Sequence, residues 1–270
     1  MPVRLPRMNF EAAVDAVVNG DIAALERMLR ADPDLVRARS SREHHATLLH
    51  YVGANGVEDE RQRTPKNAVE VARVLLDAGA DIHAMADMYG GSDTLGLAAT
   101  SCHPRDAGVQ IPLMEFLISR GATFDTATVN ACLANGRHEA AEYLAARLGD
   151  ALDLEAAAGV GRLALLPRLI DDATDAQKRA GLAWACEYGR TAASMFLLDH
   201  GVPVDARVPP HGGTGLHWAA HEGHIDLINA LLSRGAPLDI RDQTFDGTPL
   251  EWAEHGGHPD AVAALRRHQA

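Results

Sequence analysis

The residues best suited to chemistry in this chain are its 14 histidines, three of which cluster in the stretch His217-Trp-Ala-Ala-His-Glu-Gly-His224. His217 and His221 are four positions apart, so a helix would place both imidazoles on one face, where they could ligate a metal ion. Gly223, however, would end such a helix before His224. The order His-Glu-Gly-His also differs by one residue from the H-E-x-x-H zinc motif. We therefore predict no metal site at this cluster.

A second group of reactive side chains lies outside the helical patterns. His44, His45, Asp87, Tyr89 and His103 fall in turn-rich segments of the first half of the chain. Histidine serves as acid, base or ligand, so a pocket built from these residues is the main enzymatic possibility. No Ser-His-Asp order, phosphate-binding loop or spaced carboxylate pair accompanies them. We assign no catalytic residue, and a small-molecule binder or enzyme at these positions remains the alternative hypothesis.

One glycine pattern suggests a nucleotide cofactor but is better explained by a turn. Gly159-Val-Gly161-Arg-Leu-Ala164 fits a loose dinucleotide-binding pattern. That motif requires a strand before the glycines, whereas an alanine-rich helical segment precedes them here. We therefore predict no cofactor.

The composition narrows the class of partner and the compartment. The net charge of −12 argues against nucleic acid, because phosphate binding needs a basic face. No apolar stretch of about 18 residues occurs and the N-terminus lacks a signal-peptide core, so we expect no membrane insertion. The three cysteines are scattered, which fits a reducing cytoplasm. The preference for Arg over Lys suggests a bacterial origin.

These side chains must be positioned by a repeated element. Trp184, Trp218 and Trp252 are spaced 34 residues apart, and three glycines, at 189, 223 and 257, share that spacing. A constant period of this size indicates a small unit copied in tandem. Each unit is too small to bury its own apolar face, so it must stack on its neighbours as a solenoid.

The clearest unit runs from Gly213 to Gly247. Its first helix, around Trp218–Glu222, stops at Gly223, and a second helix over 225–234 carries apolar residues at helical spacing. These residues resemble the ankyrin repeat, whose signature is T-P-L-H-x-A-A-x-x-G-H followed by a Leu-rich helix and G-A. The resemblance is best in Thr214–Ala236 and in Thr248–His258. It implies that His217 satisfies backbone groups of the adjoining hairpin and that the tryptophans pack mainly between repeats.

The resemblance extends along nearly the whole chain in weaker copies. We predict one all-α ankyrin-repeat domain over 1–270, a solenoid of about eight helix-turn-helix units with hairpin fingers. Repeats four and five are short and are expected to lack fingers. Repeats two and three carry insertions between their helices, at 57–67 and 102–108, which we expect to form loops. The predicted boundaries are a cap at 8–39, repeats at 40–83, 84–125, 126–152, 153–175, 176–207 and 208–241, and a C-terminal cap at 242–270.

The family resemblance also implies a function and a surface. Ankyrin proteins contact partners through finger tips and the last turn of each first helix, which form a concave face. We therefore expect a protein–protein interaction module with an as yet unidentified protein partner, and the array requires no oligomer. Carried over position by position, the expected binding residues are Asn55, Asp87, Tyr89, Asn135, Glu187, Tyr188, His211, His221, Glu222, Phe245 and His255.

Overall fold

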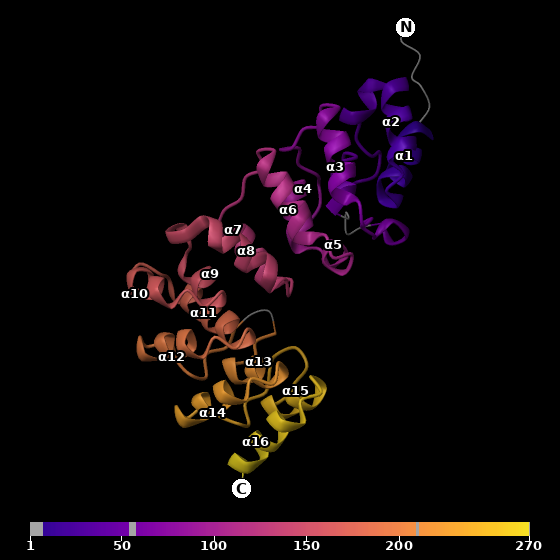
Figure 1. The fold of residues 1–270 in the computed structure, drawn as a ribbon. Helices are drawn as coiled ribbons and strands as arrows, with labels where there is room; N and C mark the ends of the chain where they lie inside the picture. Colours follow the sequence, from indigo (N-terminus) through magenta and orange to yellow (C-terminus); the bar gives the residue numbers. More distant parts are fainter. Residues whose placement is uncertain (1–7, 54–57, 209–210, 270) are drawn as a thin grey trace. The chain divides into compact units, whose positions relative to one another are not determined.

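The computed structural model describes residues 8–53, 58–208 and 211–269, and throughout these ranges the regular structure is helical (Figure 1). The chain divides into two compact units, Met1–Tyr143 and Leu144–Ala270, called unit 1 and unit 2 below. The division falls inside α8, His138–Leu148. The predicted single array over 1–270 and its count of eight repeats remain predictions.

Unit 1 consists of short helices in two layers. In one layer η2 contacts both α1 and α4, and α4 contacts α7; in the other α3 contacts both α2 and α6. Leu48, Leu95 and Leu113 are among the side chains fully buried in this unit. Its elements before α8 are α1 Met8–Asn19, α2 Ile22–Ala31, η1 Pro33–Arg37, η2 His50–Gly53, η3 Asp59–Arg61, α3 Ala68–Asp77, α4 Thr94–Thr100, α5 Cys102–Asp106, α6 Gln110–Ser119 and α7 Thr126–Ala134.

Unit 2 has the same two-layer arrangement. α9, α11, α13 and α15 contact one another in chain order, and α12, α14 and α16 form a second row in the same order (Figure 1). A one-dimensional stack of this kind buries the face that each helix pair leaves open. Its elements after α8 are η4 Gly149–Ala151, α9 Leu154–Gly159, η5 Leu163–Leu165, α10 Leu166–Leu169, α11 Asp175–Glu187, α12 Thr191–Asp199, α13 Gly215–His221, α14 Ile225–Ser233, α15 Pro249–His255 and α16 Pro259–Gln269.

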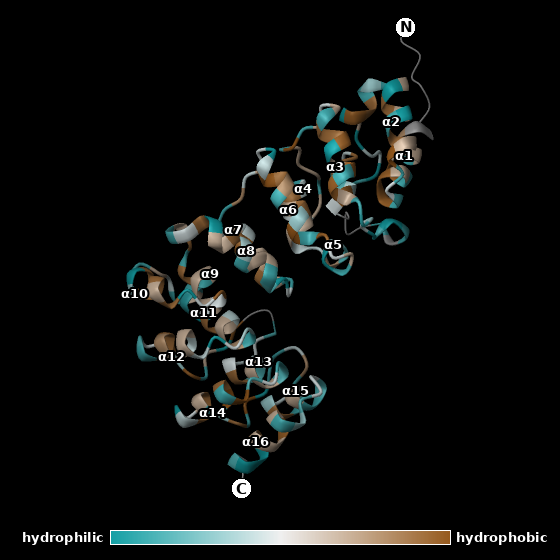
Figure 2. Ribbon diagram, in the orientation of Figure 1, coloured by the Kyte–Doolittle hydropathy of each residue, from teal (hydrophilic) through white to brown (hydrophobic). Residues whose placement is uncertain are grey.

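Helix α14 shows why these segments are helical and half-buried. Leu227, Ile228 and Leu231 share one face and are buried, while Asp226 in the first turn is exposed. This acidic residue near the helix N-terminus also complements the helix dipole. Figure 2 shows hydrophobic and hydrophilic residues alternating along the helices in this way. The stripe fixes which face enters the stack.

Two of the glycines at the 34-residue spacing, Gly189 and Gly223, follow the first helix of their repeat and lie against a histidine ring of the next repeat. Gly189 and Gly223 have φ values of +65° and +73°, in the left-handed region. A Cβ at Gly189 would lie 2.8 Å from the ring of His224, and one at Gly223 would lie 2.6 Å from the ring of His258. Both the backbone angle and the close ring therefore require glycine at these turns.

Hairpins with a backbone bridge occur at both ends of the chain but not in its middle. Isolated antiparallel bridges join Arg39 to Thr47, Ala86 to Ser92, and Val208 to Gly213. No such bridge lies within residues 93–207, all of which are described. This agrees with short middle repeats that lack hairpins, which stays a prediction because the hairpin before α15 also has no such bridge.

Several local expectations were wrong. In repeat two the first helix is reduced to the 3-10 helix η2, and residues 54–57 lie outside the described residues. The segment 102–106, expected to be a loop, is helix α5, because the Ser101 hydroxyl caps it by accepting the His103 N–H. Helix α11 starts at Asp175, one residue before the predicted repeat boundary at 176, because Thr174 and Gln177 form a capping box. In the repeat predicted at 153–175 the second helix is split into η5 and α10, with a proline at position 167.

Candidate functional site

Unit 2 contains a recess of about 610 Å³, lined mainly by aromatic and histidine rings, between α13, α15 and the hairpin that precedes α15. We call it the aromatic pocket. The last residues of α13 and α15 face it, which is the position from which the sequence predicts partner contacts. Its lining consists of His211, Trp218, His221, Phe245, Asp246, Gly247, Glu251, Trp252 and His255.

The walls of the aromatic pocket are rings packed edge to face. The ring centroids of Trp218 and Trp252 are 5.2 Å apart with an interplanar angle of 84°. His211 lies 5.0 Å from Phe245 and 6.1 Å from Trp252, measured between centroids. Trp252 is 8% exposed, whereas Phe245 is 65% exposed. We call the buried ring of Trp252 the floor of the pocket and the exposed ring of Phe245 part of its rim. The T-shaped contact with Trp218 restricts the orientation of the Trp252 ring.

The buried carboxylate of Asp242 connects Trp252 to the hairpin that precedes α15. Asp242 is only 4% exposed and accepts the Trp252 indole N–H at 2.9 Å. It also accepts the backbone N–H groups of Thr244, Phe245 and Gly247 at 2.7 to 2.8 Å. Burial opposes ionisation, but these hydrogen bonds outweigh it and lower the pKa of Asp242 to about 2. The hairpin therefore folds around a permanent negative charge that orients Trp252 and Phe245.

Two further carboxylates lie on the rim. Asp246 adopts φ +54° at the hairpin turn and is highly exposed. Glu251 accepts the Thr248 N–H and hydroxyl in the capping box of α15, and these hydrogen bonds lower the pKa of Glu251. The Arg241 guanidinium lies 3.5 Å from a Glu251 oxygen and 3.9 Å from an Asp246 oxygen. Among the nine lining residues two are acidic and none is Lys or Arg.

Two of the expected binding residues, His221 and His255, lie side by side in the lining of the aromatic pocket and are called the histidine stripe below. The rings of His221 and His255, one repeat apart, have centroids separated by 6.0 Å. His221 Nδ1 is 2.7 Å from an oxygen of Glu222. His217 is instead buried: its Nδ1 accepts the Thr214 N–H, and its Nε2 donates to the Gly247 carbonyl. His217 thus joins α13 to the next hairpin, as the family resemblance implies.

Glu187 and Tyr188 end α11 next to the pocket without lining it. Glu187 is mostly buried, and its Oε2 has no hydrogen-bond partner among the described residues. Burial and the nearby Glu222 raise the pKa of Glu187 to about 7. The carbonyl of Glu187 accepts the His224 Nε2–H at 2.8 Å, so this helix end is connected to the following repeat.

The predicted residues of unit 1 are divided between two places. Tyr89 and Asn135 line a cavity of about 840 Å³, together with His103 and Arg137. Asp87 forms an exposed pair with His45, with 2.7 Å between Oδ2 and Nδ1. Asn55 lies outside the described residues.

The five residues of the enzymatic alternative do not converge. Tyr89 and His103 line the unit 1 cavity, and His45 pairs with Asp87. His44 is buried and contacts Glu58 at 2.7 Å, while its Nδ1 accepts the Ala46 N–H. Since His44 belongs to a buried hydrogen-bond network, the proposed pocket of His44, His45, Asp87, Tyr89 and His103 is not formed.

That network is a feature which sequence reasoning missed. Glu58, 5% exposed, accepts the Tyr51 hydroxyl at 2.5 Å and pairs with Arg42 at 2.5 Å and Arg61 at 3.1 Å. Burial opposes its ionisation, but the hydrogen bonds from Tyr51 and His44 and the two guanidinium groups lower the pKa of Glu58. Arg61 also reaches Asp15 in α1 at 2.9 Å. The segment after η2, predicted as a loop, is anchored to the N-terminal helix.

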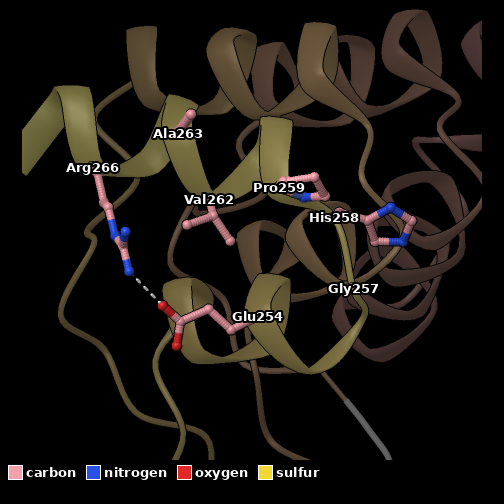
Figure 3. Close-up of a pocket in the computed structure, with 7 residues that line it drawn as sticks. All are labelled: Glu254, Gly257, His258, Pro259, Val262, Ala263 and Arg266. Atoms are coloured by element: carbon pink, nitrogen blue, oxygen red, sulfur yellow. Dashed lines mark hydrogen bonds and ion pairs between the residues drawn. The ribbon is translucent and has the colours of Figure 1, made fainter.

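A smaller recess of about 550 Å³ lies between α15 and α16. Its lining includes Gly257, Pro259, Val262 and Ala263, beside the ion pair of Arg266 with Glu254 at 2.8 Å (Figure 3). No aromatic ring other than the imidazole of His258 lines it, so it offers less apolar surface for an anchor side chain than the aromatic pocket does.

The sequence also did not predict that the tryptophans would line a pocket. The spacing of Trp218 and Trp252 indicated packing between repeats, which is correct, but the same rings line the aromatic pocket. The role of Asp242 could not be predicted either, because the backbone donors of its hairpin come together only after folding.

Comparison with known families agrees with the unit 2 architecture. Residues 154–242 match the model of the family described as ankyrin repeats (3 copies). Residues 154–242 are therefore ankyrin repeats, as the sequence predicts, and the match lies within unit 2. No curated protein matches the chain.

The described residues offer neither a metal site nor a membrane span. No group of three or more His, Cys, Asp or Glu side chains is placed to hold a metal ion there. In the same ranges no helix has the length and apolar character needed to cross a bilayer.

Proposed function

We propose that this protein is an interaction module that binds a segment of a partner protein in the aromatic pocket and along the histidine stripe of unit 2. The observation that supports this most is the exposed ring of Phe245 beside Trp218 and Trp252. Ankyrin repeats generally mediate protein–protein interactions, and interface hot spots are enriched in aromatic side chains that sit in preformed pockets.

The aromatic pocket can bind a protein segment more specifically than a flat surface could, because side chains of the segment can enter it. A recess of about 610 Å³ admits one or two side chains. His221, Glu222 and His255 continue from its mouth along the ends of α13 and α15, so neighbouring residues of a bound segment would find polar partners. Glu187 and Tyr188 extend the same surface by one repeat. Recognition would thus combine an aromatic anchor with a polar surround.

We further propose a cytoplasmic setting and about eight repeats within the boundaries given above. The cysteines Cys102, Cys132 and Cys186 are all free. Burial raises the pKa of the Cys132 and Cys186 thiols to about 12, which keeps them unreactive. This state agrees with a reducing compartment.

The test compares two exposed aromatic residues on hairpins of different units. Phe245→Ala should abolish capture of the native partner from cells, because the anchor surface is lost, whereas its exposure means that folding is retained. Tyr89→Ala is the matched control, since Tyr89 is 71% exposed in unit 1. Co-purifying proteins are identified for each variant, and circular dichroism checks that both remain folded.

The outcome separates the two surfaces. Loss of one partner with Phe245→Ala and its retention with Tyr89→Ala supports the proposal. The reverse result would place the partner at the unit 1 cavity and refute binding at the aromatic pocket.

A further inference from the structure

We infer that the aromatic pocket receives an arginine side chain of the partner. The inference rests on the proposed function and specifies its chemistry. Three features of the described residues lead to it: the exposed ring surfaces, the excess of carboxylates, and the hydrogen-bond acceptors at the rim.

The rings supply faces for a planar cation. Guanidinium groups stack on tryptophan and phenylalanine, and the interaction strengthens when water is partly excluded. Trp218 and Trp252 stand nearly perpendicular, and both line the recess together with the more exposed ring of Phe245. The exposed ring of Phe245 lies at the rim and offers a further aromatic surface. The long apolar stem of arginine would occupy the rest of the recess.

The charges around the pocket favour a cation. Asp242 beneath the floor is ionised under all physiological conditions, and Asp246 and Glu251 lie on the rim, with Glu222 close to the mouth. Two guanidinium groups oppose these four carboxylates. Arg241 pairs with the rim acids, and Arg207 donates to the Gly212 and Arg241 carbonyls. The balance is negative, and the whole chain carries −12.

The rim already binds one guanidinium within the chain. Arg241 donates to the backbone carbonyl of Asp246 and approaches the Glu251 carboxylate. The Asp246 carboxylate, which is 84% exposed and 3.9 Å from the Arg241 guanidinium, keeps room for the donors of a second arginine. A lysine ammonium would satisfy fewer of the rim acceptors, because its donors do not form a planar fork.

The test uses three peptides that differ at one position: acetyl-Ala-Ala-Arg-Ala-Ala-amide and its lysine and citrulline analogues. Citrulline has nearly the shape of arginine but no charge. Binding is followed through the fluorescence of Trp218 and Trp252, and calorimetry gives an independent affinity. We expect the arginine peptide to bind saturably, about tenfold more tightly than the citrulline peptide and more tightly than the lysine peptide.

Two variants test the charge of the rim. Glu251→Gln removes a carboxylate but retains a capping-box residue for α15, so it should weaken the arginine peptide about three- to tenfold without unfolding the helix. Asp226→Asn is the matched control, because it removes one negative charge from the exposed first turn of α14, away from the pocket. It should leave the affinity unchanged. Added salt should weaken the arginine peptide most.

Several results would overturn the inference. These are equal affinity for arginine and citrulline, equal affinity for arginine and lysine, equal effects of Glu251→Gln and Asp226→Asn, or no saturation by the arginine peptide up to about 10 mM. If partner capture still depends on Phe245 in that case, the proposed function stands and only the arginine assignment fails. If the peptides behave as expected but capture does not depend on Phe245, the proposed function fails instead.

Discussion

Asp242 and Glu187 are both carboxylic acids in the last repeats, yet their surroundings shift their pKa values in opposite directions. Asp242 is buried among three backbone donors and an indole N–H, so its charged form is favoured. Glu187 is buried beside Glu222, and one of its oxygens has no partner in the described part of the chain, so its neutral form is favoured. The number of hydrogen-bond donors around each carboxylate, rather than burial alone, therefore decides whether its pKa is raised or lowered.

The raised pKa of Glu187 has a consequence for stability. Its ordinary value is 4.5 and its value in the folded protein is about 7, so between these values the folded state holds a proton that the unfolded state has lost. The contribution of Glu187 to the free energy of unfolding is therefore fully present below pH 4.5 and is lost as the pH rises through about 7. We expect a loss of up to about 2 kcal/mol, since the carboxyl retains some contact with water.

Glu187→Gln should remove this pH dependence and be more stable than the wild type at pH 8. Urea unfolding followed by tryptophan fluorescence at pH 5, 6, 7 and 8 measures it. Glu222→Gln is the control, because it removes only the charge that faces Glu187 and should weaken the dependence without abolishing it. Parallel pH curves for wild type and Glu187→Gln would contradict the prediction.

At the scale of elements, the segment with η3 behaves as part of the core rather than as a tolerant loop. Glu58 and Arg61 are 5% and 8% exposed, and Arg61 connects the segment to α1 through Asp15. A buried charge pair adds little net stability over apolar residues, but removal of one partner leaves the other charge uncompensated.

Glu58→Ala should lower the free energy of unfolding by about 1–3 kcal/mol, because the buried Tyr51 hydroxyl and Arg61 each lose a partner, although Arg61 keeps Asp15 and Glu11. Far-UV circular dichroism during urea unfolding measures the change. Glu60→Ala, an exposed acidic neighbour on the same 3-10 helix, should change stability by less than about 0.5 kcal/mol. Similar values for the two variants would show that the segment is a dispensable loop.

At the scale of the whole molecule, all three tryptophans lie in unit 2, whereas both units contribute helices. Tryptophan fluorescence therefore reports on the unfolding of unit 2, and far-UV circular dichroism reports on the entire chain. In repeat proteins each unit gains its stability from itself and its immediate neighbours, so a defect in an early repeat has its largest effect locally.

We therefore expect Glu58→Ala to shift the urea midpoint seen by circular dichroism more than the midpoint seen by tryptophan fluorescence. Both probes are recorded on the same samples of the full chain. In the wild type the two midpoints serve as the reference. Equal shifts at both probes would mean that the chain unfolds as one cooperative whole and would refute the expectation.

Much of this architecture could be predicted from the sequence, because it depends on interactions that are local or that recur at a fixed period. The glycines at 189 and 223 mark left-handed turns, and the Thr214-x-x-His217 pattern closes a hydrogen bond over three residues. The apolar stripe of α14 follows from its own residues. The tryptophan spacing indicated stacking between repeats, and the Trp218–Trp252 contact shows that stacking.

Contacts between distant, unpatterned positions could not be predicted. The sequence by itself determined the repeat and most of its helix pairs, because both depend on short-range periodicity. Only the tertiary structure decided that Asp242 holds a hairpin against Trp252, that Phe245 and His211 complete a recess there, and that Glu58 turns a presumed loop into core. Those features arise where separate segments bring donors, acceptors and rings within a few ångströms, and such proximity leaves no periodic trace along the chain.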